Sequence, residues 1–183
     1  MISSTSSASE YRPKNFEEMI GQDAIVKTLN NAIKKDNIPQ ALLFCGPRGV
    51  GKTSCARILA KTINNLEEEF EYNIFELDAA SNNSVEDIRN ITDQIRIPPQ
   101  TGRYKVYIID EVHMLSNQAF NAFLKSLEEP PEHVVFILAT TEKNKILPTI
   151  LSRCQIYDFK KVDSKSITKL LLKICKEKKI KHE

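Results

Sequence analysis

The chain contains a complete phosphate-loop pattern, G-x-x-x-x-G-K-T, at residues 46–53. Glycines let backbone N–H groups turn toward an anion without an obstructing Cβ, and a following helix N-terminus adds partial positive charge. Lys52 can reach the β- and γ-phosphates of a nucleotide, and the Thr53 hydroxyl can ligate Mg²⁺. The alternative is a glycine-rich turn that binds nothing. The apolar run 41–45 before the loop and the helical pattern after it favour a nucleotide site.

Two acidic residues, Asp110 and Glu111, follow the apolar run 105–109. A carboxylate at the tip of an apolar strand can hold Mg²⁺, and Asp110 fits that role. Glu111 can polarise a water molecule for attack on a γ-phosphate. An acidic pair after a strand is weak support by itself. Together with an intact phosphate loop, it predicts the second half of one nucleotide site.

Further candidates are two threonines and two arginines. Thr140 and Thr141 close the run 134–138, where a hydroxyl could lie beside a γ-phosphate; two β-branched residues that simply end a strand fit equally well. Arg153 is either an ordinary surface charge or a finger that reaches the ATP of a neighbouring subunit, and spacing does not separate these alternatives. Arg48, within the loop, is expected to point to solvent.

Alternating apolar runs and helical patterns predict the elements that position these residues. Strands are predicted at 41–45, 73–78, 105–109, 134–138 and 156–159. Helices are predicted at 17–36, 51–64, 84–95 with Ser84 as N-cap, 117–128, 147–151 and 166–179. Continuous apolar strands that alternate with helices indicate an α/β fold, with a parallel sheet covered on both faces. Both nucleotide motifs then lie at carboxyl ends of strands, where such sheets bind ligands.

Length and composition place the chain among ordinary globular proteins. Its 183 residues give room for one domain and the start of a second, and 41% apolar with 27% charged residues suffices for a substantial core. The net charge of +2 argues neither for nor against nucleic acid. No apolar stretch approaches the roughly 20 residues that span a bilayer, and residues 1–9 lack the features of a secretory signal. We expect a cytoplasmic protein without membrane contact.

The four cysteines, Cys45, Cys55, Cys154 and Cys175, are dispersed and form no C-x-x-C pair. Tetrahedral zinc sites use closely spaced ligand pairs, so we expect reduced, mostly buried thiols and no zinc ligands.

Several further segments stand in a fixed order around these motifs. They are Tyr11-Arg12-Pro13, Ile20-Gly21-Gln22, Glu76–Ser81, Ser84–Arg89, Asp110–Leu115, Leu127–Pro131, Leu138–Thr141 and Ser152-Arg153-Cys154. From about Tyr11 to its end, the chain resembles the AAA+ ATPase core of the bacterial DNA polymerase III gamma/tau clamp-loader family. The Ser-Arg-Cys triplet and the Asp-Ala-Ala-Ser segment are typical of clamp-loader ATPases, including replication factor C. The segment 121–131 favours the bacterial branch.

This resemblance implies a role for each motif residue. Adenine would be bordered by Tyr11, Arg12, Pro13, Ile20 and Gly21. The nucleotide phosphates would be held by Gly46, Gly49, Val50, Gly51, Lys52, Thr53 and Ser54. Mg²⁺ would bind Thr53 and Asp110. The catalytic group would comprise Lys52, Glu111 for the attacking water, Thr141 as sensor with Thr140 as its alternative, and Arg153 acting in trans.

The resemblance also implies a function and partners. The chain would be the ATP-binding and hydrolysing motor subunit of the replicative clamp loader, within a DNA-directed DNA polymerase complex, with ATP and Mg²⁺ as cofactors. Its partners would be other loader subunits in a hetero-oligomer, the sliding clamp and primed DNA. DNA phosphates would be contacted near residues 81–83 and the start of the 84–95 helix, which carries Arg89.

Two other functions remain as alternatives. A non-catalytic scaffold subunit is disfavoured by the intact Lys52, Thr53, Asp110 and Glu111. A helicase-like ATPase is suggested by the Asp-Glu-Val-His segment, but the clamp-loader triplet and the lack of a second helicase lobe argue against it. We therefore expect His113 to pack or hydrogen bond at a strand end.

The chain departs from the family pattern in two places. The family's four-cysteine zinc module is replaced by the cysteine-free segment 63–72. The chain also stops within the first helix of the family's lid, so it resembles an N-terminal fragment. We expect a flexible lead-in at 1–10, an AAA+ P-loop ATPase domain at 11–161, and the start of a truncated helical lid at 162–183.

Overall fold

The structure is a computed structural model that describes residues 11–65 and 71–177. The predicted lead-in at 1–10 and the last residues of the predicted lid, 178–183, lie outside the described residues. So does the middle of the cysteine-free segment, 66–70.

A five-stranded parallel sheet forms the centre of the molecule. Its strands are β1 (Ala41–Cys45), β2 (Ile74–Asp78), β3 (Lys105–Asp110), β4 (Val134–Thr140) and β5 (Gln155–Asp158), in the order β2-β3-β4-β1-β5. Every residue of β1 and β4 is buried. Because both faces of these strands are covered, both faces must be apolar, which explains the uninterrupted apolar runs in the sequence.

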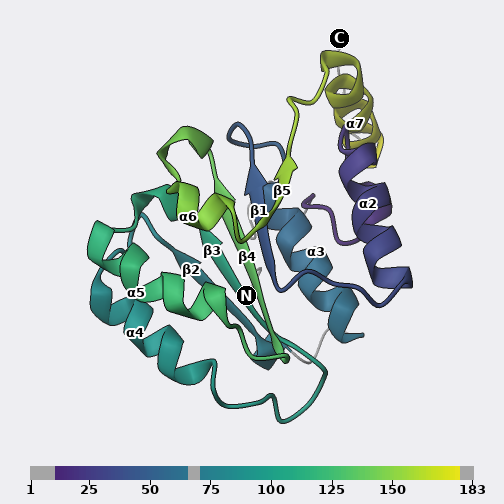
Figure 1. Cartoon of the computed structure of the whole chain (residues 1–183). Helices are drawn as coiled ribbons and strands as arrows, with labels where there is room; N and C mark the ends of the chain where they lie inside the picture. Colours follow the sequence, from purple (N-terminus) through teal and green to yellow (C-terminus); the bar gives the residue numbers. More distant parts are fainter. Residues whose placement is uncertain (1–10, 66–70, 178–183) are drawn as a thin grey trace, which may run out of the picture.

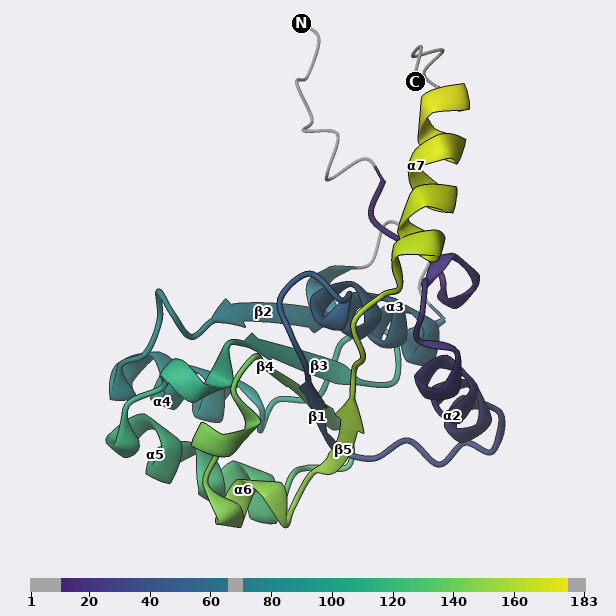
Figure 2. The same cartoon turned by 90° about the horizontal axis from the view of Figure 1, so that it is seen from above.

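Helices cover both faces of the sheet, as predicted (Figure 1, Figure 2). One face packs against α2 (Asp23–Lys34) and α3 (Lys52–Asn64), and the opposite face against α4 (Val85–Gln94), α5 (Asn117–Glu128) and α6 (Pro148–Leu151). Each face has its own apolar core, so β1, β3 and β4 contribute alternate side chains to two separate clusters.

The helix predicted at 17–36 is wrong over residues 17–22. A short 3₁₀ turn, η1 (Phe16–Glu18), is capped by Asn15, whose side-chain oxygen accepts from the Glu18 amide at 3.0 Å. The chain then extends to Gly21, whose φ of 72° suits glycine, and α2 begins only at Asp23. The apolar residues at helical spacing, Ile25, Leu29 and Ile33, all lie within α2, so they do not support a helix before Asp23.

Smaller differences occur at other element ends. The 3₁₀ turn η2 (Glu71–Asn73) precedes β2, so that strand starts one residue later than predicted. Two further 3₁₀ turns, η3 (Val112–Met114) and η4 (Lys143–Lys145), follow β3 and β4. The predicted N-cap of α4 is confirmed: Ser84 and Asp87 form a reciprocal capping box.

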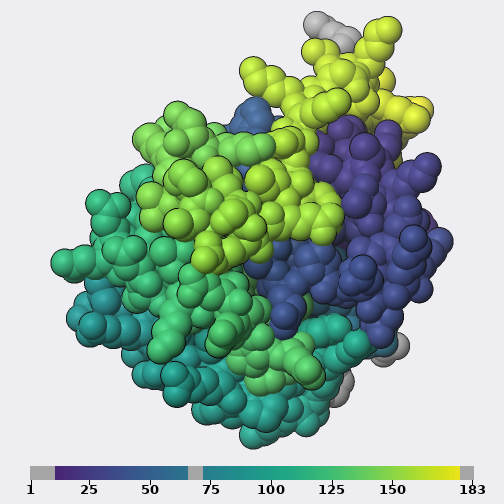
Figure 3. Space-filling view, viewed as in Figure 1, coloured from purple at the N-terminus to yellow at the C-terminus, as the bar shows by residue number. Residues whose placement is uncertain are grey.

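The last helix, α7 (Ser164–Glu177), starts two residues earlier than predicted and projects away from the sheet (Figure 2). It exposes Ile167, Leu171 and Leu172. The linker before it runs beside the N-terminal segment, where a Cβ on Gly21 would lie 3.4 Å from Val162, and Figure 3 shows the purple and yellow-green parts of the surface adjoining. The division into separate domains near residue 161 stays a prediction.

Candidate nucleotide-binding site

The phosphate loop connects β1 to α3 at the carboxyl end of the sheet. Gly46 has a φ of 150°, and a Cβ there would lie 2.6 Å from the Phe159 carbonyl oxygen, so a side chain cannot be accommodated. Gly51 caps α3 with a φ of 96°. These two positions therefore require glycine for the path of the backbone. Arg48 is exposed, as predicted.

Lys52 lies folded over this loop and is only 6% exposed. Its Nζ donates hydrogen bonds of 2.8 Å to the carbonyl oxygens of Gly46 and Pro47. Burial lowers the pKa of Lys52, while the carboxylates of Glu111 and Asp110 act to raise it. The ammonium is thus placed over the loop, and phosphate oxygens can replace two neutral carbonyls as its partners.

The two halves of the predicted site meet at Thr53 and Asp110. The Thr53 hydroxyl donates a 2.6 Å hydrogen bond to Asp110 Oδ2 although the residues are 57 positions apart in the sequence. A hydroxyl and a carboxylate are the hard oxygen ligands that Mg²⁺ prefers, so the residues present fit that ion. The structure confirms that both motifs form one cluster at the carboxyl ends of β1 and β3.

Glu111 has a left-handed backbone, with φ 47° and ψ 44°. This conformation costs a non-glycine residue of order 1–3 kcal/mol and is found most often where function requires it. The Glu111 Oε2 accepts hydrogen bonds from the Thr141 hydroxyl at 2.9 Å and the Thr141 amide at 3.2 Å. The candidate base and the candidate sensor therefore lie in direct contact.

Thr140, the alternative sensor, is buried and faces His113 instead. Its hydroxyl oxygen lies 2.9 Å from His113 Nδ1 and accepts from the Glu142 amide at 3.0 Å. The His113 side chain is 5% exposed, and its two ring nitrogens each lie 3.4 Å from a carboxylate, of Glu111 and Glu142 respectively. The expectation that His113 is a hydrogen-bonding residue at a strand end is confirmed.

The predicted adenine border is only partly placed by the structure. The segment of Ile20 and Gly21 lies against the loop, because Gln22 Nε2 donates to the Val50 carbonyl at 3.3 Å. Contacts of Tyr11, Arg12 and Pro13 with a base stay a prediction. So does the role of Ser54, which lies in the first turn of α3.

Arg153 lies apart from all the other predicted site residues. Its Nη2 contacts Glu128 Oε1 at 2.6 Å, and its Nη1 donates to the Thr149 carbonyl at 2.7 Å. It precedes β5, in which Gln155 pairs with Leu42. The phosphate loop begins four residues beyond Leu42, about 13 Å further along the strand at roughly 3.3 Å per residue. The structure thus places Arg153 near the amino end of the sheet and the loop at the carboxyl end.

Three residues had no predicted role but contact the predicted site residues or the loop through their side chains: Gln22, Glu128 and Glu142. Gln22 and Glu128 belong to the segments that carry the family resemblance, but their spacing in the sequence does not indicate which residues they contact. Glu142 bonds Lys145, which lowers the Glu142 pKa most, with His113 adding to the effect.

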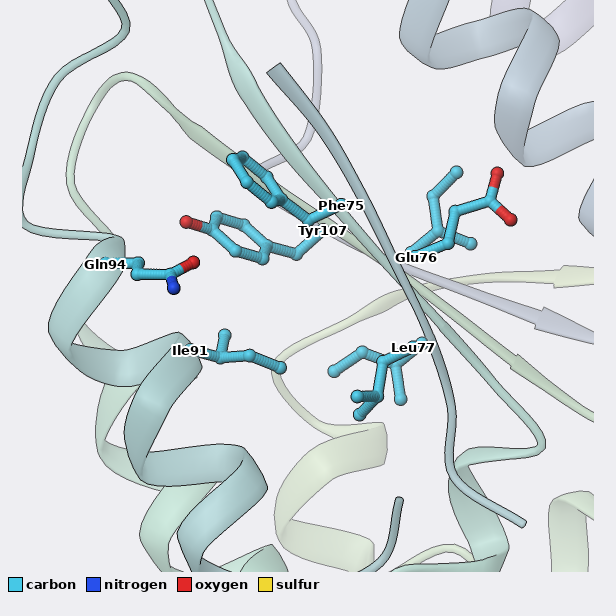
Figure 4. A pocket seen from close by; sticks show the side chains of 8 residues that line it. Phe75, Glu76, Leu77, Ile91, Gln94 and Tyr107 are labelled. Atoms are coloured by element: carbon cyan, nitrogen blue, oxygen red, sulfur yellow. The ribbon is translucent and has the colours of Figure 1, made fainter. Parts of the chain in front are cut away.

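A hollow of about 170 Å³ lies away from the nucleotide motifs, between β2, β3 and α4 (Figure 4). Its walls are mainly apolar and include Phe75, Leu77, Ile91, Gln94 and Tyr107. Burial raises the pKa of Tyr107 to about 12, and its hydroxyl has no hydrogen-bond partner among the described residues. No residue of the phosphate loop contributes to it.

The remaining sequence expectations concern cysteines and membranes. Cys45 and Cys55 are buried and Cys154 and Cys175 half-buried, and burial raises the pKa of Cys45 to about 11. Within 11–65 and 71–177, no group of three or more His, Cys, Asp or Glu side chains is placed to hold a metal. The absence of zinc stays a prediction. No helix in these ranges is long and apolar enough to cross a membrane.

The sheet order and the loop together define a parallel α/β fold of the phosphate-loop, nucleotide-binding type. Solved structures agree on the fold. Thermotoga maritima RuvB, a Holliday junction branch migration motor, has a TM-score of 0.72 at 22% identity, over 92% of this chain and 55% of that one. A gamma subunit-related protein of DNA polymerase III from the same organism has a TM-score of 0.66 at 24% identity, over 81% and 52%. At these identities the likeness shows the fold alone.

Sequence comparison shows the family. Residues 21–74 and 67–163 match the family model described as DNA polymerase III, delta subunit, and the chain belongs to this family. It is 47% identical to the DNA polymerase III subunit tau of Bacillus subtilis, over 94% of this chain and 34% of the relative. Identity to the Escherichia coli DNA polymerase III subunit tau is 44%, over 96% of this chain and 30% of the relative. The chain thus spans about a third of the length of these relatives.

Proposed function

We propose that the chain is the ATP-binding and hydrolysing motor of a bacterial replicative clamp-loader subunit, which loads the sliding clamp onto primed DNA. The observation that carries this proposal is the 2.6 Å hydrogen bond between Thr53 and Asp110, which joins the two halves of a phosphate-loop NTPase site. The similarity to DNA polymerase III tau subunits supports a place in replication, and hence in the cytoplasm.

ATP would bind with its phosphates on the loop amides between Gly46 and Ser54 and on the Lys52 ammonium. Its adenine would lie beside Tyr11, Arg12, Pro13, Ile20 and Gly21. Thr53 and Asp110 would hold Mg²⁺, which neutralises phosphate charge when bound.

Glu111 would then polarise the attacking water. Its Oε2 is engaged by the Thr141 hydroxyl and amide, so Thr141 fixes the direction of the carboxylate while Oε1 remains available to the water. A hydroxyl that contacts both Glu111 and the γ-phosphate would link base position to nucleotide state, which is the role of a sensor.

Arg153 would complete the site of a neighbouring subunit. Its distance from its own phosphate loop supports action in trans, as does its position just before β5, the strand at the edge of the sheet. An arginine that stabilises transition-state charge contributes on the order of 10³–10⁵ in rate.

Contact with the phosphates of primed DNA is proposed through the segment before α4, which includes Ser81, Asn82 and Asn83. The capping box already uses the amides of Ser84 and Asp87, and Glu86 and Asp87 add negative charge there. A DNA phosphate would therefore be held by side chains, including the exposed Arg89, rather than by the helix N-terminus. Such contacts would lack sequence preference and weaken with salt.

A titration with a fluorescent ATP analogue and Mg²⁺ tests the proposal on this chain. We expect saturable binding that Lys52→Ala weakens strongly. No binding by the unaltered chain would favour the scaffold alternative. The helicase alternative has no further support, because the likeness to RuvB extends to the fold only.

A further inference from the structure

Gln22 lies at the junction of three segments that are distant in the sequence. It is 3% exposed. Its Nε2 donates to the carbonyl oxygens of Val50, at 3.3 Å, and Lys160, at 2.8 Å. Its Oε1 accepts from the Lys160 amide at 3.2 Å. One side chain therefore connects the phosphate loop to the linker 159–163, which leads from β5 to α7.

The same linker contacts the beginning of the loop. The Phe159 amide donates to the Cys45 carbonyl at 2.7 Å, directly before Gly46. Next to Gln22, a Cβ on Gly21 would lie 3.4 Å from Val162. The linker therefore contacts the start of the loop through Phe159, at Cys45 and Gly46, and is joined to Val50 through the Gln22 side chain.

Because the Gln22 amide bonds to both, the phosphate loop and the 159–163 linker have little freedom to move independently. Both amide hydrogens and the oxygen of Gln22 are used, so displacement of Val50 breaks a buried hydrogen bond or moves Gln22. Leaving a buried carbonyl or amide unpaired is costly, so moving together is favoured. A loop that adjusts around phosphates would transmit this change to Lys160.

We propose that Gln22 is a positioning residue that couples occupancy of the phosphate loop to the 159–163 linker, and through it to the placement of α7. This inference rests on nucleotide binding at the loop, as proposed above. The coupling is reciprocal: fixing the linker raises nucleotide affinity by the same factor by which nucleotide fixes the linker.

The chain provides a matched control in Gln40. Its Nε2 also donates to two backbone carbonyls, of Pro130 at 3.4 Å and Pro131 at 2.8 Å, but at the amino end of the sheet. Gln40 has the same chemistry as Gln22 and touches neither the loop nor the linker in these contacts. If the loss of any glutamine that bonds two backbone carbonyls had the same effect, substitution of Gln40 would produce it as well as substitution of Gln22.

The first measurement needs no variant. Side-chain amide signals of Gln22 and Gln40 are followed by NMR while a slowly hydrolysed ATP analogue and Mg²⁺ are added. We expect the Gln22 signals to shift and their hydrogen exchange to slow, with Gln40 unchanged. Backbone signals of the loop that respond while Gln22 does not would overturn the coupling.

The second measurement compares hydrogen exchange of 159–163 in the unaltered chain, Gln22→Leu and Gln40→Leu. We expect the nucleotide to slow exchange about ten-fold in the unaltered chain and in Gln40→Leu, but not in Gln22→Leu. Full protection in nucleotide-bound Gln22→Leu would contradict the inference. If the unaltered chain bound no nucleotide, the proposed function would fail first, so the two failures are distinguishable.

Discussion

The two ends of the parallel sheet differ in how their charged groups are held. At the carboxyl end, Lys52, Asp110 and Glu111 are bonded to the loop and to neighbouring hydroxyls within one cluster. At the amino end, Arg153 and Glu128 form a pair whose side chains are 32% and 50% exposed. One end holds its charged groups in a preformed cluster of hydrogen bonds, whereas the other holds its cation mainly through an exposed ion pair.

This difference suggests separate roles for the two ends, nucleotide binding at the carboxyl end and a contribution to hydrolysis at the amino end. An exposed ion pair is worth only about 0–1 kcal/mol, so Arg153 can leave Glu128 for a more highly charged partner at little cost. The phosphate of a nucleotide bound by a neighbouring subunit would be such a partner. The phosphate loop in the same chain as Arg153 lies at the other end of the sheet. We therefore expect the carboxyl end to bind nucleotide unaided and the amino end to matter only in an assembly.

Arg153→Ala should have the largest effect on hydrolysis. In the assembled complex of the full-length protein, we expect turnover to fall by on the order of 10³–10⁵ while nucleotide affinity stays within two-fold. Steady-state hydrolysis and a binding titration check this. Lys125→Ala, an exposed cation on α5, serves as the control and should retain activity.

Lys52→Ala should instead damage the carboxyl end in the isolated chain. Loss of one charge-assisted contact costs about 1.5–3 kcal/mol, so we expect affinity for ATP to fall by roughly 10- to 150-fold. Arg48→Ala removes an exposed cation of the same loop and should change affinity little. Equal losses in both variants would mean that net charge, rather than the placement of Lys52, controls binding.

Gly46→Ala tests how tightly the loop is packed against the linker. The new Cβ would lie 2.6 Å from the Phe159 carbonyl oxygen, so we expect the free energy of unfolding to drop by about 1–3 kcal/mol in urea titrations. Gly49 has a φ of 78° but open space around its Cβ. Gly49→Ala separates the cost of backbone conformation from that of the clash and should destabilise less.

Glu128→Gln should have the smallest effect. Removing the acceptor charge leaves Arg153 mobile, and we expect hydrolysis in the assembly to change only a few-fold, in keeping with an exposed pair. The change should vanish in an Arg153→Ala background, because Glu128 acts through Arg153. Glu129→Gln, the exposed neighbour, should have no effect in either background.

Much of the fold followed from the sequence because β1 and β4 are buried on both faces, which leaves uninterrupted apolar runs. The motifs placed Thr53 and Asp110 together because carboxyl ends of parallel strands meet at one edge. The break at Gly21 was missed because the prediction extended the helix beyond the residues that carry its apolar spacing, Ile25, Leu29 and Ile33. The Gln22–Lys160 bonds join residues 138 positions apart, and no local pattern encodes such a polar contact.

The contrast between the two ends is tested most directly by mixing two inactive variants. Lys52→Ala keeps an intact Arg153, and Arg153→Ala keeps an intact phosphate loop. If Arg153 serves the neighbouring site, complexes that hold both variants side by side contain interfaces with every required group. We predict that mixing restores a substantial fraction of ATP hydrolysis. A mixture as inactive as either variant alone would show that Arg153 serves its own subunit and would contradict this division of the molecule.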